Sequence, residues 1–237
     1  MGALGPRTRP RLPHRGLIGE LAYYHWSLPE NRRRVVAPIE GNQMAHKPGE
    51  LSDVQFQKMT EQEIWKLLTG GTGLIEVMWP GSDDERIDMD AHIKECFGPH
   101  LAIQVKCVSW LARSGKGYRL VKSFDEKVER LHASPLYWYI FAHLSMPILE
   151  FTDPLFLVES ERVHCCADPQ PKGEVIAFTF EASVQPTSRD QWHDCKVAPL
   201  DLAARVLELL RKVQGAQGLV PIQMPAPAVG IVVGLRG

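Results

Sequence analysis

The chain has 237 residues, of which 44% are hydrophobic and 23% are charged, values ordinary for a globular protein. This length fits one substantial domain with tails, or at most two small domains. No apolar run approaches the ~20 residues of a membrane-spanning helix, and the N-terminus lacks the hydrophobic stretch of a secretory signal, so no membrane association is expected. Five cysteines, an odd number, do not indicate a disulfide framework, and we expect a reducing cytoplasm.

The formal net charge of -1 conceals an uneven distribution. Residues 1–36 hold seven arginines against two glutamates, a charge of +5 that leaves -6 for the remainder. The first residues are also rich in Pro and Gly, a composition typical of flexible segments. We therefore expect residues 1–50 to form a basic, largely flexible arm. An anionic partner and a simply solvated tail both explain its charge.

The folded core is expected to begin near Ser52. Ser52 with Gln55, and Thr60 with Glu63, both have the spacing of a capping box, so a helix could start at either position. We favour one helix over about residues 53–69, ended by the glycines of residues 70–73. Residues 74–79 then predict a strand and residues 80–84 a turn.

Two segments with alternating apolar and polar residues follow. In residues 86–93, Asp88 lies on the face opposite Ile87 and Met89; in residues 101–108, Gln104 and Lys106 share the face opposite Ile103, Val105 and Cys107. Alternation of this kind is typical of half-buried strands. If the two strands pair as a hairpin, a carboxylate, an amide and an ammonium group project from one side of the sheet.

The rest of the chain predicts further helices and strands. Residues 123–126 read as a capping box that opens a helix to about Ala133. Residues 137–144, 154–159 and 174–184 predict strands, and residues 199–213 predict an amphipathic helix. The order α-β-β-β-α-β favours an α/β fold with a central mixed sheet flanked by helices.

The three polar side chains suit metal-dependent chemistry. A divalent cation such as Mg²⁺ prefers oxygen ligands and usually keeps several waters. Asp88 can supply a carboxylate, Gln104 an amide oxygen and Val105 its backbone carbonyl. Lys106 could then orient or help deprotonate an attacking water, or stabilise the charge that grows on a phosphate.

Glu63 is the expected fourth member of this set. At about 100° per residue, it falls within the arc of the helix that carries Phe56, Met59, Ile64 and Leu67. A carboxylate turned toward a core is costly unless it is paired or binds a cation. The alternative is that Glu63 only completes the capping box that begins at Thr60.

The helix with Glu63, the strand with Asp88 and the strand with Gln104-Val105-Lys106 resemble the core of the PD-(D/E)XK nuclease superfamily. More narrowly, they resemble a branch of uncharacterised bacterial domains whose third motif reads Gln-x-Lys. The resemblance covers about residues 52–160, so it implies a restriction-endonuclease-like domain over residues 51–185. Residues 186–237 would then form a C-terminal helix and a Pro/Gly-rich tail.

The resemblance implies hydrolysis of phosphodiester bonds in DNA, with RNA as the alternative substrate, in phage defence or DNA processing. Glu63, Asp88, Gln104 and Val105 would hold Mg²⁺ or Mn²⁺, and Lys106 would be the catalytic lysine. Two departures matter: Ile87 stands where the family has Pro, and the neutral Gln104 removes one negative charge from the site. A catalytically inactive nucleic-acid-binding or assembly module is therefore the alternative function. A homodimer and a partner protein both stay open.

Two further groups of residues carry possible chemistry. A basic segment follows the Gln-x-Lys strand directly and suits contacts with phosphate groups, although a solvated loop explains it equally well; its cations are Arg113, Lys116, Arg119 and Lys122. His164, Cys165 and Cys166, with His193 and Cys195, are of zinc-ligand types. The adjacent cysteines lack the Cys-x-x-Cys spacing of a structural zinc site, so we expect core or loop cysteines.

Overall fold

A computed structural model of the chain describes residues 51–80, 87–96, 98–115 and 117–216. The basic arm and the C-terminal tail predicted from the sequence lie outside these residues. Among the helices that are described, none is both long enough and apolar enough to cross a membrane.

The first helix, α1 (Asp53–Thr72), begins at the earlier of the two predicted starts. The hydroxyl of Ser52 accepts a hydrogen bond from the N–H of Gln55 (3.2 Å), and the N–H of Ser52 donates to the Gln55 side chain (2.9 Å). This reciprocal pair satisfies two of the N–H groups that a helix start leaves open. The helix ends at Gly73, whose φ of 67° is the left-handed conformation that glycine adopts without strain. Thr60 lies inside the helix, where its hydroxyl donates to the carbonyl of Gln57.

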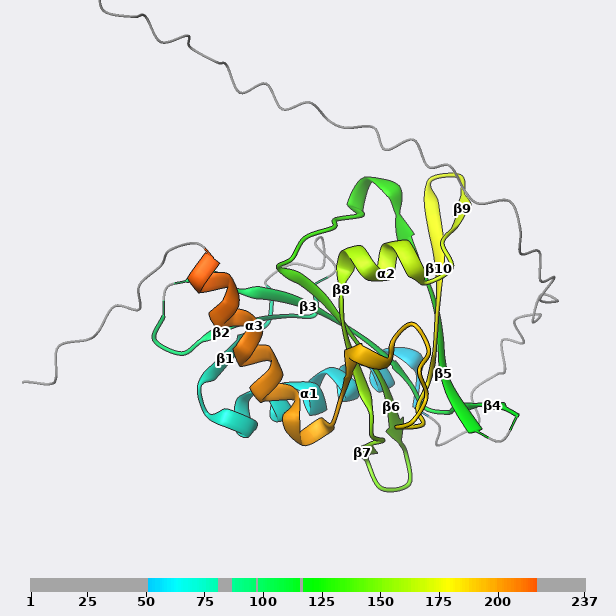
Figure 1. Cartoon of the computed structure of the whole chain (residues 1–237), viewed down its shortest axis with the longest axis horizontal. Helices are drawn as coiled ribbons and strands as arrows, with labels where there is room; N and C mark the ends of the chain where they lie inside the picture. Colours follow the sequence, from blue (N-terminus) through cyan, green and yellow to red (C-terminus); the bar gives the residue numbers. More distant parts are fainter. Residues whose placement is uncertain (1–50, 81–86, 97, 116, 217–237) are drawn as a thin grey trace, which may run out of the picture. The chain divides into compact units, whose positions relative to one another are not determined.

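The central sheet has seven strands and is mixed, which confirms the predicted fold class (Figure 1). Its strand order is β1 (Ile75–Met78), β2 (Met89–Ile93), β3 (Leu101–Val108), β6 (Tyr137–Ser145), β8 (Leu155–Glu159) and β11 (Lys196–Val197), with β7 (Glu150–Phe151) paired to β6. Strands β3 and β6 run parallel, and the other neighbouring strands of this sheet pair antiparallel. The predicted hairpin of β2 and β3 is therefore present.

A second sheet of four strands replaces the helix expected at residues 123–133. Its order is β4 (Ala112–Ser114), β5 (Gly117–Lys127), β10 (Val175–Ser183) and β9 (Gln170–Lys172). The helix prediction is wrong because β5 pairs with β10 over nine consecutive residues, and only the short 3₁₀ turn η2 (Val128–Arg130) follows. Tertiary pairing of this length overrides a local capping signal.

The two faces of the central sheet pack against different layers. Helices α1 and α3 (Leu202–Ala216) cover one face, with Ile64, Leu68, Ile103 and Val206 in the shared core (Figure 1). The four-stranded sheet and α2 (Ser160–Cys166) cover part of the other face, where the core is aromatic and includes Phe141, Phe178 and Phe180. The rings of Phe141 and Phe180 stack with centroids 3.8 Å apart.

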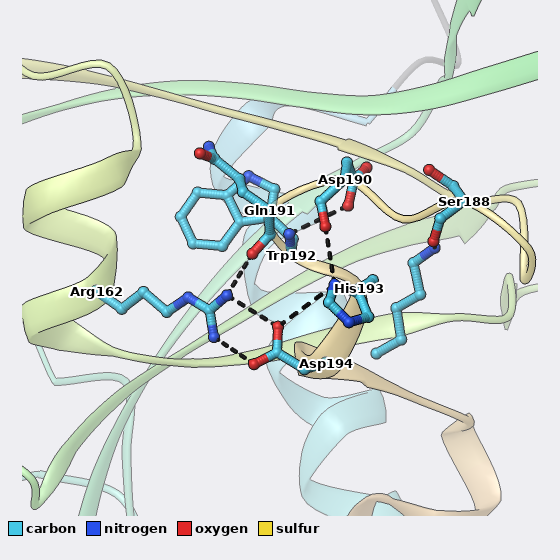
Figure 2. A network of polar contacts seen from close by, with 8 residues as sticks. Arg162, Ser188, Asp190, Gln191, Trp192, His193 and Asp194 are labelled. Carbon is cyan, nitrogen blue, oxygen red and sulfur yellow. Dashed lines mark hydrogen bonds and ion pairs between the residues drawn. The ribbon is translucent and has the colours of Figure 1, made fainter.

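The segment after residue 185 joins the same core. Trp192 is fully buried, the turns η3 (His193–Cys195) and η4 (Pro199–Asp201) follow, and α3 packs against α1. Arg162 of α2 donates to both carboxylate oxygens of Asp194, at 2.7 and 2.8 Å, and to the carbonyl of Gln191 (Figure 2). This bidentate contact fixes α2 to the segment that leads into β11.

Candidate active site

Strand β3 presents its two sides as its alternation predicts. Ile103, Val105 and Cys107 are buried in the core beneath α1 and α3. Gln104 and Lys106 project from the opposite face, because successive side chains of a strand alternate. Gln104 is 4% exposed, and the Lys106 side chain is 17% exposed. Both polar groups therefore lie in a largely desolvated environment.

Asp88 is positioned directly across from this pair of residues. The register Met89↔Ile103 places Asp88 opposite Gln104, and its N–H donates to the carbonyl of Ile103 (3.0 Å). Its carboxylate accepts a 2.6 Å hydrogen bond from the N–H of Val105. The N–H and C=O of one strand residue point to the same side, so the Val105 carbonyl also faces the side of Asp88. Thus three of the predicted site residues meet at the start of β2.

The acid that α1 contributes to this region is Glu61. Its side chain is fully buried; one carboxylate oxygen lies 2.9 Å from Lys58, and the other has no hydrogen-bond partner among the described residues. Glu63 instead lies on the flank of α1, 29% exposed and 2.6 Å from Lys66. The structure therefore replaces Glu63 with Glu61 as the buried acid of this helix.

The protonation of Asp88 reflects its surroundings. Burial raises the pKa of its carboxyl to about 6, the Val105 hydrogen bond opposes this rise, and the nearby Glu61 carboxylate adds to it. Lys106 and Lys58 pull the pKa down, but more weakly. Two carboxylates held together without full compensation favour the uptake of a cation or a proton.

Lys106 is held between the two sheets. Its ammonium lies 3.8 Å from the carboxylate of Glu126 and 5.0 Å from the centre of the Phe124 ring, both on β5. Glu126 is 4% exposed. Strand β5, where the sequence predicts a helix, thus brings the buried acid Glu126 to Lys106. The alternation of Leu120, Phe124 and Glu126 was the sequence signal that could have revealed it.

Gln104 is also hydrogen-bonded. The hydroxyl of Tyr137 on β6 donates to its side-chain oxygen at 2.7 Å. An amide oxygen has two lone pairs, so this bond leaves one available. The contact fixes the amide with its oxygen toward Tyr137.

A polar pocket of about 310 Å³ opens beside Lys106. The N-terminal half of α1 supplies Gln57 and Thr60, and β5 supplies Lys122 and Ser123. Two ammonium groups therefore line one pocket, which suits an anionic ligand such as a phosphate.

The other predicted phosphate contacts lie at different places. Arg113 is exposed on β4. Arg119 lies on the far side of β5 from Lys122 and 2.8 Å from Glu181, so its charge is matched. Lys116 lies outside the described residues.

The oxygen donors are of the types that a hard divalent cation prefers. Glu61 and Asp88 offer carboxylate oxygens, one of them buried and without a hydrogen bond, and Gln104 and Val105 offer neutral oxygens. Among the residues with defined positions, no three or more His, Cys, Asp or Glu side chains group closely enough to hold an ion. Mg²⁺ is commonly bound through one or two carboxylates plus waters, so two acids suffice. The same result leaves the His164 and Cys195 regions without a zinc site over the described residues.

Comparison with known proteins finds only distant structural similarity. No family model matches the chain, and no curated protein matches it. Among solved structures, the chain is similar to a bacterial homing endonuclease, I-Ssp6803I, with a TM-score of 0.43 and 14% sequence identity. The match covers 72% of this chain and 100% of the endonuclease.

Proposed function

We propose that the chain is a metal-dependent phosphodiesterase that cuts DNA at the face carrying Asp88, Gln104 and Lys106. The observation that carries the proposal is the contact between the Asp88 carboxylate and the N–H of Val105. It joins the acid of one strand to the residue between Gln104 and Lys106 on the next. The buried Glu61 and the pocket lined by two lysines add the remaining parts of a hydrolytic site.

The residues divide the work as follows. Asp88 and Glu61 would hold Mg²⁺ or Mn²⁺, with Gln104 and Val105 completing the set of oxygens. A bound divalent cation polarises a phosphoryl oxygen and acidifies a coordinated water. Lys106 faces the pocket, where it can position a water or stabilise the charge that develops on the phosphate. Lys122, which lines the same pocket, can hold a neighbouring phosphate.

A matched pair of variants on α1 tests the site. Purified full-length chain is incubated with supercoiled, linear and single-stranded DNA, and with RNA, in Mg²⁺, Mn²⁺ or EDTA. We expect cleavage that needs a divalent cation and that Asp88→Ala, Lys106→Ala and Glu61→Gln each reduce by about 10² or more. Glu63→Gln should cleave as the wild type does, because Glu63 is engaged with Lys66. Cleavage that survives Asp88→Ala and Lys106→Ala would show that the activity resides elsewhere.

A second candidate is a nucleic-acid-binding module without catalysis. The neutral Gln104, whose oxygen accepts the Tyr137 hydroxyl, favours it, because the site then has one carboxylate fewer and a structural use for the amide. The same assays separate the two candidates: binding of DNA without cleavage in either metal selects the module.

A further inference from the structure

The hairpin of β4 and β5 has one face that continues into the candidate site. Arg113 and Tyr118 are register partners, so their side chains lie on the same face of the four-stranded sheet. Alternate residues along β5 share that face, which therefore also carries Lys122 and Phe124. Leu120, between Tyr118 and Lys122 on this face, is fully buried in the aromatic core, so the face is open only at its Tyr118 end, while Lys122 lines the pocket beside Lys106.

The outer end of this face presents an aromatic ring and a cation to solvent. Tyr118 is 55% exposed and Arg113 is exposed. Residues 110–122 contain four Lys or Arg residues and no Asp or Glu. Arg119, on the other face, is matched by Glu181 at 2.8 Å. Among the described cations of the hairpin, Arg113 and Lys122 therefore lie on the inner face. Their positive charge is complementary to a phosphate backbone.

The spacing along β5 suits a nucleic-acid strand. At ~3.3 Å per residue, Tyr118 lies roughly 13 Å from Lys122 along the strand. This span corresponds to about four nucleotides at the ~3.4 Å rise of a stacked strand. Proteins that bind single strands combine cations that follow the backbone with aromatic rings on which bases stack. A fully paired duplex offers no base face to Tyr118, because its bases are stacked on one another.

We infer that the exposed end of the β4–β5 hairpin, which carries Arg113 and Tyr118, holds a single-stranded stretch of the DNA beyond the candidate site, with Tyr118 stacked on an unpaired base. Arg113, the cross-strand partner of Tyr118, contacts a phosphate next to that base, and Lys122 contacts a phosphate about four nucleotides away, at the pocket. This inference rests on the proposed function for its substrate and adds the form of that substrate. It concerns binding, so it can be tested without cleavage.

The test measures binding of labelled oligonucleotides by fluorescence anisotropy, with EDTA present. The probes are a single strand, an abasic strand of the same length, and a duplex. Tyr118→Ala should weaken binding of the base-bearing strand about tenfold and leave the abasic strand unchanged, while Tyr118→Phe should bind as the wild type does. Arg113→Ala should weaken both single strands, because phosphates are present in each. Lys127→Ala, a cation at the far end of β5 on its outer face, is the matched control and should change neither.

Every outcome of these binding measurements either supports or overturns the inference. An equal loss on the base-bearing and abasic strands, no loss with Tyr118→Ala, or a preference for the duplex that this variant leaves intact would overturn the inference. If the wild type binds none of the probes, the inference and the nucleic-acid function both fail. If the tyrosine effect appears but no cleavage occurs in any metal, the inference stands and the enzymatic proposal fails. If DNA is cleaved but Tyr118→Ala has no effect on binding, the enzymatic proposal stands and the inference fails.

Discussion

The carboxylate of Asp88 accepts a 2.6 Å hydrogen bond from the backbone N–H of Val105. This bond ties the start of β2 to the middle of β3 at the point where Gln104 and Lys106 project. It also holds Asp88 beside the buried Glu61, where burial and the second carboxylate raise the pKa of Asp88 to about 6. An ionised carboxylate kept in such a place destabilises the metal-free protein at neutral pH.

Asp88→Asn should stabilise the metal-free protein at about pH 7. The pKa of Asp88 is about 6 in the folded protein and 3.8 for an aspartate exposed in the unfolded chain, so between these values the folded state binds more protons than the unfolded state. The contribution of this carboxyl to the free energy of unfolding is therefore present at low pH and is lost as pH rises through about 6. One pKa unit corresponds to ~1.4 kcal/mol, so the variant should gain about 3 kcal/mol at about pH 7 and almost nothing at about pH 3. Urea unfolding at a series of pH values measures the difference.

The comparison with the wild type removes other titrations. Burial lowers the pKa of His164, which is hydrogen-bonded to Tyr139, to about 4. The free energy of unfolding that His164 contributes therefore falls as pH drops below about 6.5, whereas the contribution of Asp88 rises as pH drops. Both proteins share the His164 contribution. Added Mg²⁺ should raise the stability of the wild type and leave Asp88→Asn unchanged. If Asp88→Asn is no more stable than the wild type at neutral pH, the Asp88 carboxylate does not destabilise the folded protein there.

Glu126→Gln should lower the turnover of DNA cleavage with little change in KM. The Glu126 carboxylate lies 3.8 Å from the ammonium of Lys106, so it helps to fix where the lysine points. Loss of this positioning should reduce kcat about tenfold, against about 10² or more for Lys106→Ala. Steady-state kinetics on one DNA substrate measures both constants.

Two further variants separate positioning from folding. Glu126→Asp keeps the charge and should recover part of the lost kcat, while circular dichroism shows both variants folded. Glu129→Gln, whose side chain is 70% exposed, is the nearby control and should leave kcat unchanged. If Glu126→Gln were fully active, Lys106 would not depend on this acid.

Arg162→Ala should lower the free energy of unfolding by about 1–2 kcal/mol. The guanidinium makes a bidentate contact with Asp194 and a third hydrogen bond to the Gln191 carbonyl, and it lies 5.6 Å from the ring centre of the buried Trp192 (Figure 2). Arg205→Ala is the control, because Arg205 makes an exposed pair with Glu208 of its own helix and should cost about 0.5 kcal/mol or less. Denaturant midpoints for both variants decide; equal losses would show that the Arg162 network adds nothing.

The sequence predicts those parts of the fold whose pattern lies within a short segment. The alternation around Asp88 and Lys106 is a local pattern, and the hairpin of β2 and β3 follows it. On α1 the expected buried arc lies too close to Glu63, because Phe56, Met59 and Leu67, which define that arc, are only half-buried. The helix in fact buries Glu61, Ile64 and Leu68, at i, i+3 and i+7.

The sequence around β5 alone does not predict the second sheet. Residues 123–126 have the local spacing of a helix start, while the residues that make β5 a strand lie more than fifty positions later in β10, as in the pair Phe124↔Phe178. The contact between Glu126 and Lys106 depends on that pairing. A long-range pairing decides the fate of a segment whose local preferences are weak.

Gly71→Ala should destabilise the protein, whereas Gly70→Ala should stabilise it. A Cβ added at Gly71 of α1 would lie 2.6 Å from the Cβ of Ala203 on α3, so the two helices would have to separate, at a cost of about 1–3 kcal/mol. At Gly70 a Cβ meets nothing within 4 Å, and alanine in place of glycine in a helix gains about 0.5–1 kcal/mol. Thermal unfolding compares the two. Adding Ala203→Gly to Gly71→Ala should recover part of the loss, since it removes the atom in conflict. Equal effects at positions 70 and 71 would mean that α3 does not pack closely on α1 at Ala203.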